Sequence, residues 1–564
     1  MFKRFYIPMI LLCVLSAACR SAQSGNETVR ENVVTVAVFS INDFHASFVP
    51  DARKGIPGAA AVWQTLDSLK AVYPYHLTLS AGDNFGGSYF YKATKGCLMP
   101  VFFKGLGIRI SALGNHEFDD GQAALADKWQ STGMRPEGWD IDYVCANVRT
   151  AEGATPDYAR PWTVEEMAIG NKKLTVGIVG LLTSSTPKQT SRSRIAGLTF
   201  DGRYPQVLDS LKALPDFPVS KADIRLLLTH IGTCMQQDTP VWKDEDSAHA
   251  AALRDPMWHA FISSHMHQAV CGEINEGLPV VQGLCLGAYI SLLKFEVDTA
   301  RMQVLSVTPE LCPVRPDVAL SGEAKAFSAT IDSLLNHTLV MGGEPLCKQL
   351  TTASAEMVHD RDDKYRMSEV GTLVCDAYVA AYRRAVPASH DEVVIGASHY
   401  GSIRAGILQG PVRVLDVGEV LPFSNVLRVY KLTGEQLRAL VEFGLHNKQY
   451  GWLQTNGLEV ECDNAETLRV KSLWHTAPSG RRIRLLPDES YILVVDDYIT
   501  TGGDGYLPDL FPAAQELKTV SLPTTTEAFV QHLMSQPTIG GKAEAERRII
   551  IGGRKYASWA EMQP

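Results

Sequence analysis

The sequence predicts an α/β protein with two domains. The chain has 564 residues, which is more than one hydrophobic core usually supports. Apolar, strand-like runs alternate with helical patterns in its first part, and the composition changes after the Met-Gly-Gly-Glu stretch at residues 341–344. Hydrophobic residues at 45% and charged residues at 20% argue against a disordered or multispanning membrane protein. A net charge of −9 without a long basic run argues against a nucleic-acid polymer as partner.

The first residues have the pattern of an export signal. Two basic residues precede an apolar run at residues 7–15, which leads into small residues and Cys19. The run is too short to span a membrane as a mature helix, so we expect residues 1–19 to direct export and residues 20–32 to form a polar linker. A cysteine behind two alanines is typical of a bacterial lipoprotein signal, which predicts an acylated Cys19 and a membrane anchor. Simple cleavage after Ala18 is the alternative.

The remaining cysteines do not form a recognisable metal or disulfide pattern. Nine lie beyond Cys19, an odd number, at long spacings and without a Cys-x-x-Cys pair. A cysteine zinc site is therefore not predicted. Export would allow some pairing, but we expect most of these side chains to be small core residues.

Metal-capable side chains follow five predicted strands. These strands are residues 33–41, 76–81, 108–113, 224–229 and 260–263. The side chains that follow them are, in order, Asp43 and His45; Asp83; Asn115 and His116; His230; and His265 and His267. Each one alone would more often be a turn, core or surface residue. In α/β layers, however, sites gather at the carboxyl ends of strands, so five such placements predict one metal site. Mixed Asp, Asn and His ligands suit zinc, manganese or another divalent first-row ion better than calcium.

The heptapeptide at residues 113–119, Leu-Gly-Asn-His-Glu-Phe-Asp, is the densest of these motifs. Asn115, His116 and Asp119 place a neutral oxygen ligand, an imidazole and a carboxylate within one turn. This set suits metal-assisted phosphoryl transfer, in which an imidazole near the metal meets charge on the phosphate. Asp119 is close enough in sequence to hold His116 in one tautomer.

The five motifs, taken in order, resemble those of the calcineurin-like metallophosphoesterases, and their spacing is similar to that of the exported 5′-nucleotidase family. The resemblance implies a β-sandwich flanked by helices over residues 33–320, with two divalent ions of the zinc, manganese or cobalt type. It implies the following roles: Asp43, His45 and His267 hold one ion; Asn115, His230 and His265 hold the other; Asp83 bridges them; His116 is catalytic; and Asp119 orients His116. Two small departures stand out, because Ala46 and Ser264 occupy positions where the family usually has glycine.

The second half resembles the nucleotidase C-terminal domain. We expect a linker helix at residues 321–345 and an α+β substrate-binding domain at residues 346–564. The resemblance rests on the stretches at residues 401–404, 420–425 and 497–506. It implies the following binding roles: Phe423 and Tyr498 sandwich a base; Asp504 binds ribose hydroxyls; and Arg366 and Arg404 hold phosphate or ribose-side oxygens. His399 departs from the family, which usually has asparagine there, so we expect it to affect substrate choice.

The resemblance predicts an exported, lipid-anchored hydrolase of the periplasm or cell surface. It would convert nucleoside 5′-monophosphates to nucleoside and phosphate, through attack by a hydroxide held between two metals. Because the metal and substrate residues fall in different predicted domains, we expect turnover to require domain closure. One alternative is a 2′,3′-cyclic nucleotide phosphodiesterase or nucleotide-sugar hydrolase on the same site. An alternative of another class is a non-catalytic nucleotide-binding surface lipoprotein. The sequence carries no signal for an oligomeric state.

Overall fold

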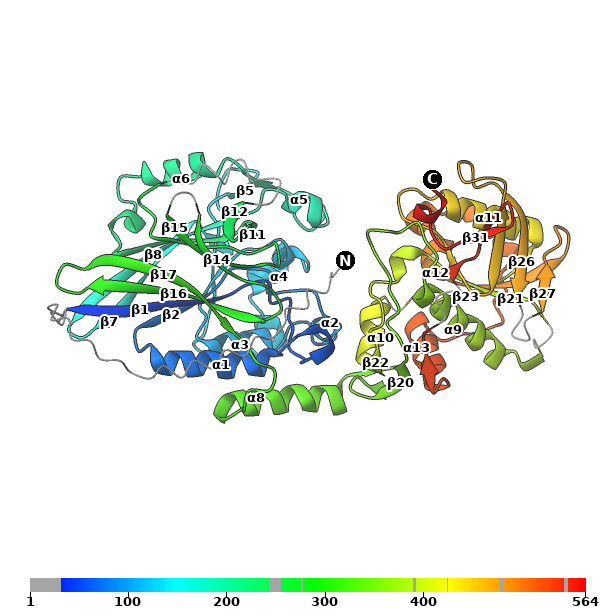
Figure 1. Cartoon of the computed structure of the whole chain (residues 1–564), viewed down its shortest axis with the longest axis horizontal. Coiled ribbons are helices and arrows are strands. Elements are labelled where there is room, and N and C mark those ends of the chain that lie inside the picture. The colour runs from blue at the N-terminus through cyan, green and yellow to red at the C-terminus, as the bar shows by residue number, and fades with distance from the viewer. Residues whose placement is uncertain are drawn as a thin grey trace, which may run out of the picture. The chain divides into compact units, whose positions relative to one another are not determined.

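The computed structural model describes residues 32–242, 255–274, 277–388, 392–423, 425–476, 481–541 and 546–563. The predicted export segment with Cys19, and the linker up to residue 31, lie outside these ranges. The chain divides into two compact units, an N-terminal unit that ends at Ile331 and a C-terminal unit that begins at Asp332 (Figure 1). Within the described ranges, none of the helices is both long and apolar enough to cross a membrane.

The N-terminal unit contains two large mixed sheets. The first has the order β17 (Gln303–Pro313), β16 (Tyr289–Asp298), β1 (Val33–Ile41), β2 (His76–Ser80), β3 (Ile110–Ala112), β4 (Asp142–Val144) and β6 (Ala159–Arg160). The second has the order β14 (Ala269–Ile274), β15 (Leu278–Gly283), β13 (Ala260–Ile262), β10 (Ile224–His230), β8 (Lys172–Leu182) and β7 (Trp162–Ile169). The pairs β1–β2, β2–β3 and β10–β13 are parallel, which brings the carboxyl ends of these strands to the same edge of each sheet.

The two sheets share one hydrophobic core. Side chains alternate between the faces of a strand, so Val176 and Ile178 of β8 enter this core together with Val36 and Val38 of β1. Leu181, on the opposite face of β8, packs instead in a second cluster with residues of α6 (Tyr204–Lys212). The unit is therefore a sandwich of two sheets flanked by helices, and the predicted fold class is confirmed.

Helices α1 (Ala59–Val72) and α3 (Met99–Leu106) lie along the outer side of the seven-stranded sheet (Figure 1). Aromatic side chains join them to α8 (Gly322–Ser333), because Phe327 stacks on Phe102 at 5.9 Å and lies 5.3 Å from Trp63. The linker helix expected at residues 321–345 ends as an α-helix at Ser333 and continues as a π-turn, and the division between the units falls inside it. The shorter helices of this unit are α2 (Tyr89–Thr94), α4 (Gln122–Asp127) and α5 (Thr186–Gln189).

The described part of the C-terminal unit contains a hairpin of β18 (Val340–Met341) and β19 (Glu344–Pro345) and three larger sheets. Their orders are β23 (Leu427–Thr433), β28 (Ser490–Asp496), β21 (Val394–Ser398) and β24 (Gln454–Thr455); β27 (Arg482–Arg484), β26 (Val470–Thr476), β25 (Leu458–Cys462), β30 (Ile549–Ile551) and β31 (Arg554–Tyr556); and β22 (Gly410–Arg413), β20 (Gln349–Ala353) and β29 (Thr538–Ile539). The first two sheets share a core with α11 (Gly434–His446), while α9 (Glu369–Ala385) contacts α13 (Thr525–Met534) and β21. This mixture agrees with the predicted α+β domain.

The cysteines of the described ranges are all unpaired. Five of them are buried: Cys145, Cys234, Cys312, Cys375 and Cys462. They behave as small apolar side chains, as the sequence predicted for most of the cysteines.

Candidate active site

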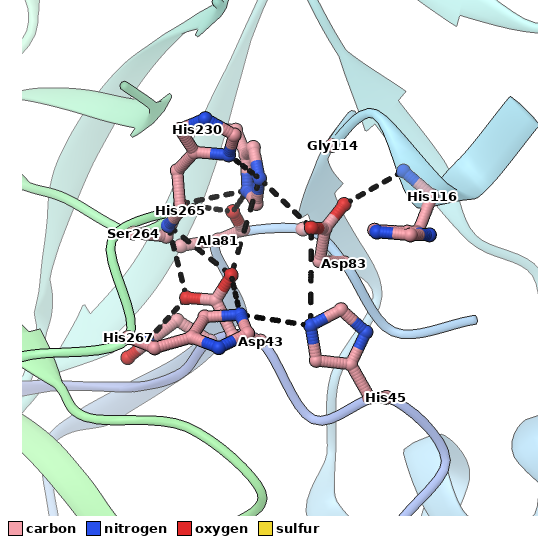
Figure 2. Close-up of polar contacts among 12 residues, drawn as sticks. Asp43, His45, Ala81, Asp83, Gly114, His116, His230, Ser264, His265 and His267 are labelled. Carbon is pink, nitrogen blue, oxygen red and sulfur yellow. Dashed lines mark hydrogen bonds and ion pairs between the residues drawn. The ribbon is translucent and has the colours of Figure 1, made fainter. Parts of the chain in front are cut away.

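The predicted metal ligands gather at one end of the sandwich. Figure 2 shows their side chains converging from loops that follow β1, β2 and β13 and from the last residue of β10. The ligands therefore come from both sheets. They lie together because parallel strands present their carboxyl ends at the same edge.

The first group of donor atoms is Asp43, His45 and His267, whose ligand atoms all lie within 4.8 Å of one another. The Nε2 atoms of His45 and His267 are 3.0 Å apart, and His267 Nε2 is 3.5 Å from Asp43 Oδ1. The carboxylate of Asp43 is completely buried. Two imidazoles that meet a buried carboxylate at this spacing form a donor set suited to a divalent ion.

The second group is Asp83, His230 and His265. His230 Nε2 lies 3.1 Å from Asp83 Oδ2 and 3.3 Å from His265 Nδ1. Asn115 points a buried Oδ1 that accepts no hydrogen bond from any residue the structure describes. A buried amide oxygen without a donor is costly unless something else satisfies it, and a metal ion would do so. The residues present therefore fit divalent metal ions.

Asp83 belongs to the second group and also approaches His45 of the first. Its Oδ2 is 3.1 Å from His230 Nε2 and 4.0 Å from His45 Nε2, while its Oδ1 accepts a hydrogen bond from the backbone N–H of His116. Burial alone would raise the pKa of this carboxyl, but His230 and His45 lower it below its usual range. Asp83 is thus placed to serve both groups.

Hydrogen bonds fix how the histidines face the site. His116 Nδ1 lies 2.7 Å from Asp119 Oδ2, so its Nε2 is the nitrogen left for a substrate. Burial opposes protonation of His116, but the bonds to Asp119 and the charge of Asp83 raise its pKa to about 9. His230 Nδ1 faces the carbonyl of Ala81 at 3.0 Å and Ser264 Oγ at 2.8 Å, which turns Nε2 inward. Ser264 thus holds a ligand, although the sequence marked it only as a small replacement for glycine.

Five of the seven predicted ligands have positive φ angles: Asp43 (47°), His45 (48°), Asp83 (51°), His265 (79°) and His267 (50°). This left-handed region costs a residue with a Cβ roughly 1–3 kcal/mol, although Asp and His are among the residues that tolerate it best. Backbone bonds hold the strained loops, because the N–H of Asp43 donates to Gly82 and that of His45 donates to Asp83. Clustered strain of this kind is typical of functional sites.

Glu117 is a buried residue that the sequence did not single out. Its Oε2 accepts the backbone N–H groups of Asp83 at 2.8 Å and Gly114 at 2.7 Å. Its Oε1 accepts the backbone N–H of Asn84 at 2.7 Å and the side-chain amide at 3.0 Å. Burial and the charge of Asp83 raise the pKa of Glu117 to about 7, against the pull of these donors. One carboxyl thus ties together the two loops that carry Asp83 and Asn115.

Replacing Glu117 by glutamine should loosen both loops. Glutamine has a single acceptor oxygen, so two buried N–H donors would face an NH₂ group. We expect the free energy of unfolding to fall by about 2–4 kcal/mol and the metal affinity to fall by about 10–100-fold. Urea unfolding and calorimetric metal titration measure the two effects. The control is Glu166→Gln, whose exposed carboxylate forms an ion pair with Lys173 on the surface. Wild-type stability and metal affinity of the Glu117 variant would contradict the proposed role.

The C-terminal unit contains a cavity of about 440 Å³ that includes most of the predicted substrate-binding residues. It is lined by Arg361, Lys364, His399, Tyr400, Gly401, Arg404, Phe423, Asn425, Gln449, Tyr450, Tyr498 and Asp504. Phe423 and Tyr498 are 44% and 43% exposed, and the guanidinium of Arg404 lies 5.8 Å from the Phe423 ring centre. Exposed aromatic faces beside cations are suited to stacking on a base.

Arg366 is not among the residues that line this cavity. Its guanidinium lies 3.2 Å from Glu546 Oε2 and 3.7 Å from Asp363 Oδ2, so it forms ion pairs within the fold. Arg361 and Lys364 line the cavity instead. The sequence places several cations within six residues, and nothing in their spacing distinguishes the one that faces the cavity.

Comparisons with known proteins agree with both units. Residues 348–513 match the family model described as 5′-nucleotidase, C-terminal domain. The chain is 24% identical to the 5′-nucleotidase of Diplobatis ommata, over 84% of this chain and 83% of that protein. It is 23% identical to the trifunctional nucleotide phosphoesterase protein YfkN of Bacillus subtilis, over 86% of this chain, which spans only 33% of that longer protein.

A solved structure, the 5′-nucleotidase precursor of Thermus thermophilus, matches with a TM-score of 0.56 and 25% identity. The match covers 92% of this chain and 99% of that structure. The sandwich fold and the paired donor groups thus define a hydrolase of the metallophosphoesterase class. Within this class, residues 348–513 match the 5′-nucleotidase C-terminal domain and the chain is similar to 5′-nucleotidases over most of its length, which supports the family predicted from the five motifs.

Proposed function

We propose that this protein hydrolyses nucleoside 5′-monophosphates to nucleoside and phosphate with the help of two divalent metal ions. The observation that carries the proposal is the pair of donor groups that meet at the buried carboxylate of Asp83, with His116 beside them. Relatives named 5′-nucleotidases, which align over most of both chains, support the choice of substrate.

The donor atoms suggest which residues hold each ion. Asp43, His45 and His267 would hold one, Asn115, His230 and His265 would hold the other, and Asp83 would contact both. Their mixture of imidazole nitrogens and oxygens suits zinc, manganese or cobalt. When bound, such ions polarise the phosphoryl oxygens and make a water molecule more acidic.

The side chains near the metals then act on the phosphate. His116, held at Nδ1 by Asp119, would donate from Nε2 to a phosphoryl oxygen as negative charge builds on it. Hydrolysis forms one bond from the water oxygen to phosphorus and breaks the bond from phosphorus to the 5′ oxygen, which leaves with a proton. Asp119 accepts the proton on Nδ1 and its charge stabilises the imidazolium form of His116, in which Nε2 also carries a proton to donate.

The cavity of the C-terminal unit would bind the nucleoside. Phe423 and Tyr498 offer aromatic faces to the base, and Asp504 would accept hydrogen bonds from ribose. Arg404, Arg361 and Lys364 would meet anionic oxygens of the substrate.

Replacing Arg361 by alanine should raise the KM for AMP by about tenfold, because one charge-assisted contact with the substrate is lost. The matched change Arg366→Ala should leave KM within about twofold of wild type and lower the melting temperature, since Arg366 pairs with Glu546 and Asp363. Steady-state kinetics and thermal unfolding of the two variants measure these effects. A raised KM in Arg366→Ala with an unchanged KM in Arg361→Ala would show that Arg366, and not Arg361, binds the substrate.

We also propose that the protein acts outside the cytoplasm, anchored through Cys19. The export pattern of residues 1–19 supports this, and a relative named a cell wall protein, from Listeria monocytogenes, aligns over 96% of this chain. Metabolic labelling with a radioactive fatty acid, comparing wild type with Cys19→Ser, tests the anchor. Equal labelling of both would refute it.

The decisive experiment for the reaction is phosphate release from AMP by protein that has been treated with a chelator. Zinc, manganese or cobalt is then added back, and a 2′,3′-cyclic nucleotide and a nucleotide sugar are assayed in parallel. Metal-dependent release that is fastest from AMP supports the proposal. Faster release from the cyclic nucleotide or nucleotide sugar would favour the corresponding alternative on the same metal site, and no release from any of the three would overturn the proposed reaction.

A further inference from the structure

His399, the departure from the family pattern, contacts two other residues of the nucleoside cavity. It follows β21 and is 94% buried, since only 6% of its surface is exposed. Its Nδ1 lies 2.7 Å from Asp504 Oδ2, and its ring stacks on that of Tyr498 with centres 4.8 Å apart and planes 27° apart. The hydroxyl of Tyr498 donates to the other oxygen, Asp504 Oδ1, at 3.1 Å. The three side chains form a closed set, which we call the His399 triad.

The triad changes what Asp504 can offer to ribose. A carboxylate is an acceptor only, so the proton in its bond with His399 belongs to Nδ1. Both oxygens of Asp504 therefore already accept a hydrogen bond from the protein. Ribose hydroxyls would have to share these oxygens with an imidazole and a phenol. Each hydroxyl then contributes less to binding than it would at a carboxylate without other donors.

The triad also fixes Tyr498 before any substrate arrives. His399 covers one face of the phenol ring, and the bond to Asp504 sets the ring's rotation. Tyr498 as a residue is still 43% exposed, which leaves surface for a base. An aromatic platform that is already ordered loses little conformational entropy on binding, so stacking retains its full contribution.

We propose that His399 sets the substrate range of this cavity, shifting recognition from the ribose hydroxyls to the face of the base. The site would then accept ribonucleoside and deoxyribonucleoside monophosphates at comparable rates. This inference rests on the proposed nucleotidase function and adds the substrate class to it. The two contacts of His399, its hydrogen bond to Asp504 and its stacking on Tyr498, can be separated by mutation.

Two substitutions of His399 separate these contacts. His399→Phe keeps an aromatic ring against Tyr498 and removes the N–H donor. His399→Asn places an amide nitrogen near the position of Nδ1 and removes the ring. The kcat/KM of each full-length variant is measured on AMP, 2′-deoxy-AMP and 3′-deoxy-AMP. Calorimetric binding of the three corresponding nucleosides is measured in parallel.

We expect wild-type protein to prefer AMP over either deoxy analogue by less than about tenfold, since the hydroxyls share their acceptor. In His399→Phe this preference should rise by about tenfold or more, because one oxygen of Asp504 becomes available to ribose. In His399→Asn the KM for all three substrates should rise together while the preference stays at the wild-type value. Loss of structure alone would not produce these two opposite patterns.

The matched control is His359→Phe, another buried histidine of the same unit, whose ring stacks on Tyr400 at 4.1 Å and 27°. It should keep the wild-type preference, even if the variant is less stable. An unchanged preference in His399→Phe, or a wild-type preference above about 100-fold, would overturn the inference while leaving the nucleotidase function intact. The expected binding pattern without phosphate release would overturn the proposed reaction instead, and no nucleoside binding at all would overturn the inference.

Discussion

Replacing Asp83 by alanine is expected to reduce phosphate release from AMP by more than about 1000-fold, because the metal centre loses the carboxylate that approaches both His45 and His230. Removing a group that only orients a metal ligand typically costs about 10–100-fold. Asp83 is more central, since its two oxygens serve the donor groups and the backbone of His116 at once. Its loss should weaken both metals and displace the catalytic loop.

The metal content of the purified Asp83 variant distinguishes this explanation from simple unfolding. We expect fewer than two ions per chain by elemental analysis, with a circular dichroism spectrum like that of wild type. Asp201→Ala is the matched control, because Asp201 belongs to the same unit and its carboxylate forms an ion pair with Arg203. If the Asp83 variant kept two ions and activity within tenfold of wild type, the bridging role would be wrong.

The second large effect is expected for His116→Ala, with kcat lower by about 100–10,000-fold, the range typical of a residue that transfers a proton or stabilises charge in the transition state. In the proposed scheme His116 meets the phosphate and is not a metal ligand. KM and the number of bound ions should therefore change little. Stopped or continuous phosphate assays across substrate concentrations separate kcat from KM.

The His116 experiment also tests the assignment of the metal ligands. His116 shares a possible donor cluster with His45 and Asp83, so loss of one ion from His116→Ala would make it a ligand. Asp119→Asn provides a graded comparison, because the amide oxygen can still accept a hydrogen bond from Nδ1 but carries no negative charge to stabilise the imidazolium. It should cost less than the loss of His116 itself. A larger cost for the Asp119 variant would require another role for this carboxylate.

The gathering of the predicted ligands could be foreseen from local sequence patterns. Each apolar run formed a strand, with β1 spanning the predicted residues and β3 shorter by two residues at its start and one at its end. Parallel pairing of β1 with β2 and of β10 with β13 then brought Asp43, Asp83 and His230 together. The clustering of side chains at the carboxyl ends of strands is predictable because it depends only on the direction of the strands.

Contacts between residues that lie far apart along the chain could not be predicted from the sequence. Glu117 looked like an ordinary acidic residue, because the N–H of Asp83 that it accepts lies 34 residues away along the chain. Arg366 and Arg361 carry the same charge in the same stretch, and only the position of Glu546 determines that Arg366 turns into the fold. The contact of His399 with Asp504 spans 105 residues. In each case one side chain is selected by tertiary packing that local propensity does not encode.

The register of the parallel strands determines how far each proposed metal ligand lies from its neighbours. Ile41, Ser80 and Ser111 stand side by side across β1, β2 and β3, and each lies only a few residues before a proposed ligand. Inserting one residue into any of these strands would advance the loop by about 3.3 Å, as much as the 3.0 Å that separates the nitrogens of His45 and His267. Beyond the turns that hold Asp43, His45 and Asp83, the crossovers that carry α1 and α3 face no such constraint. Evolution is thus free to lengthen or replace those later parts of the crossovers, while the spacing inside the strands and the first turns must stay constant to keep the proposed ligands together.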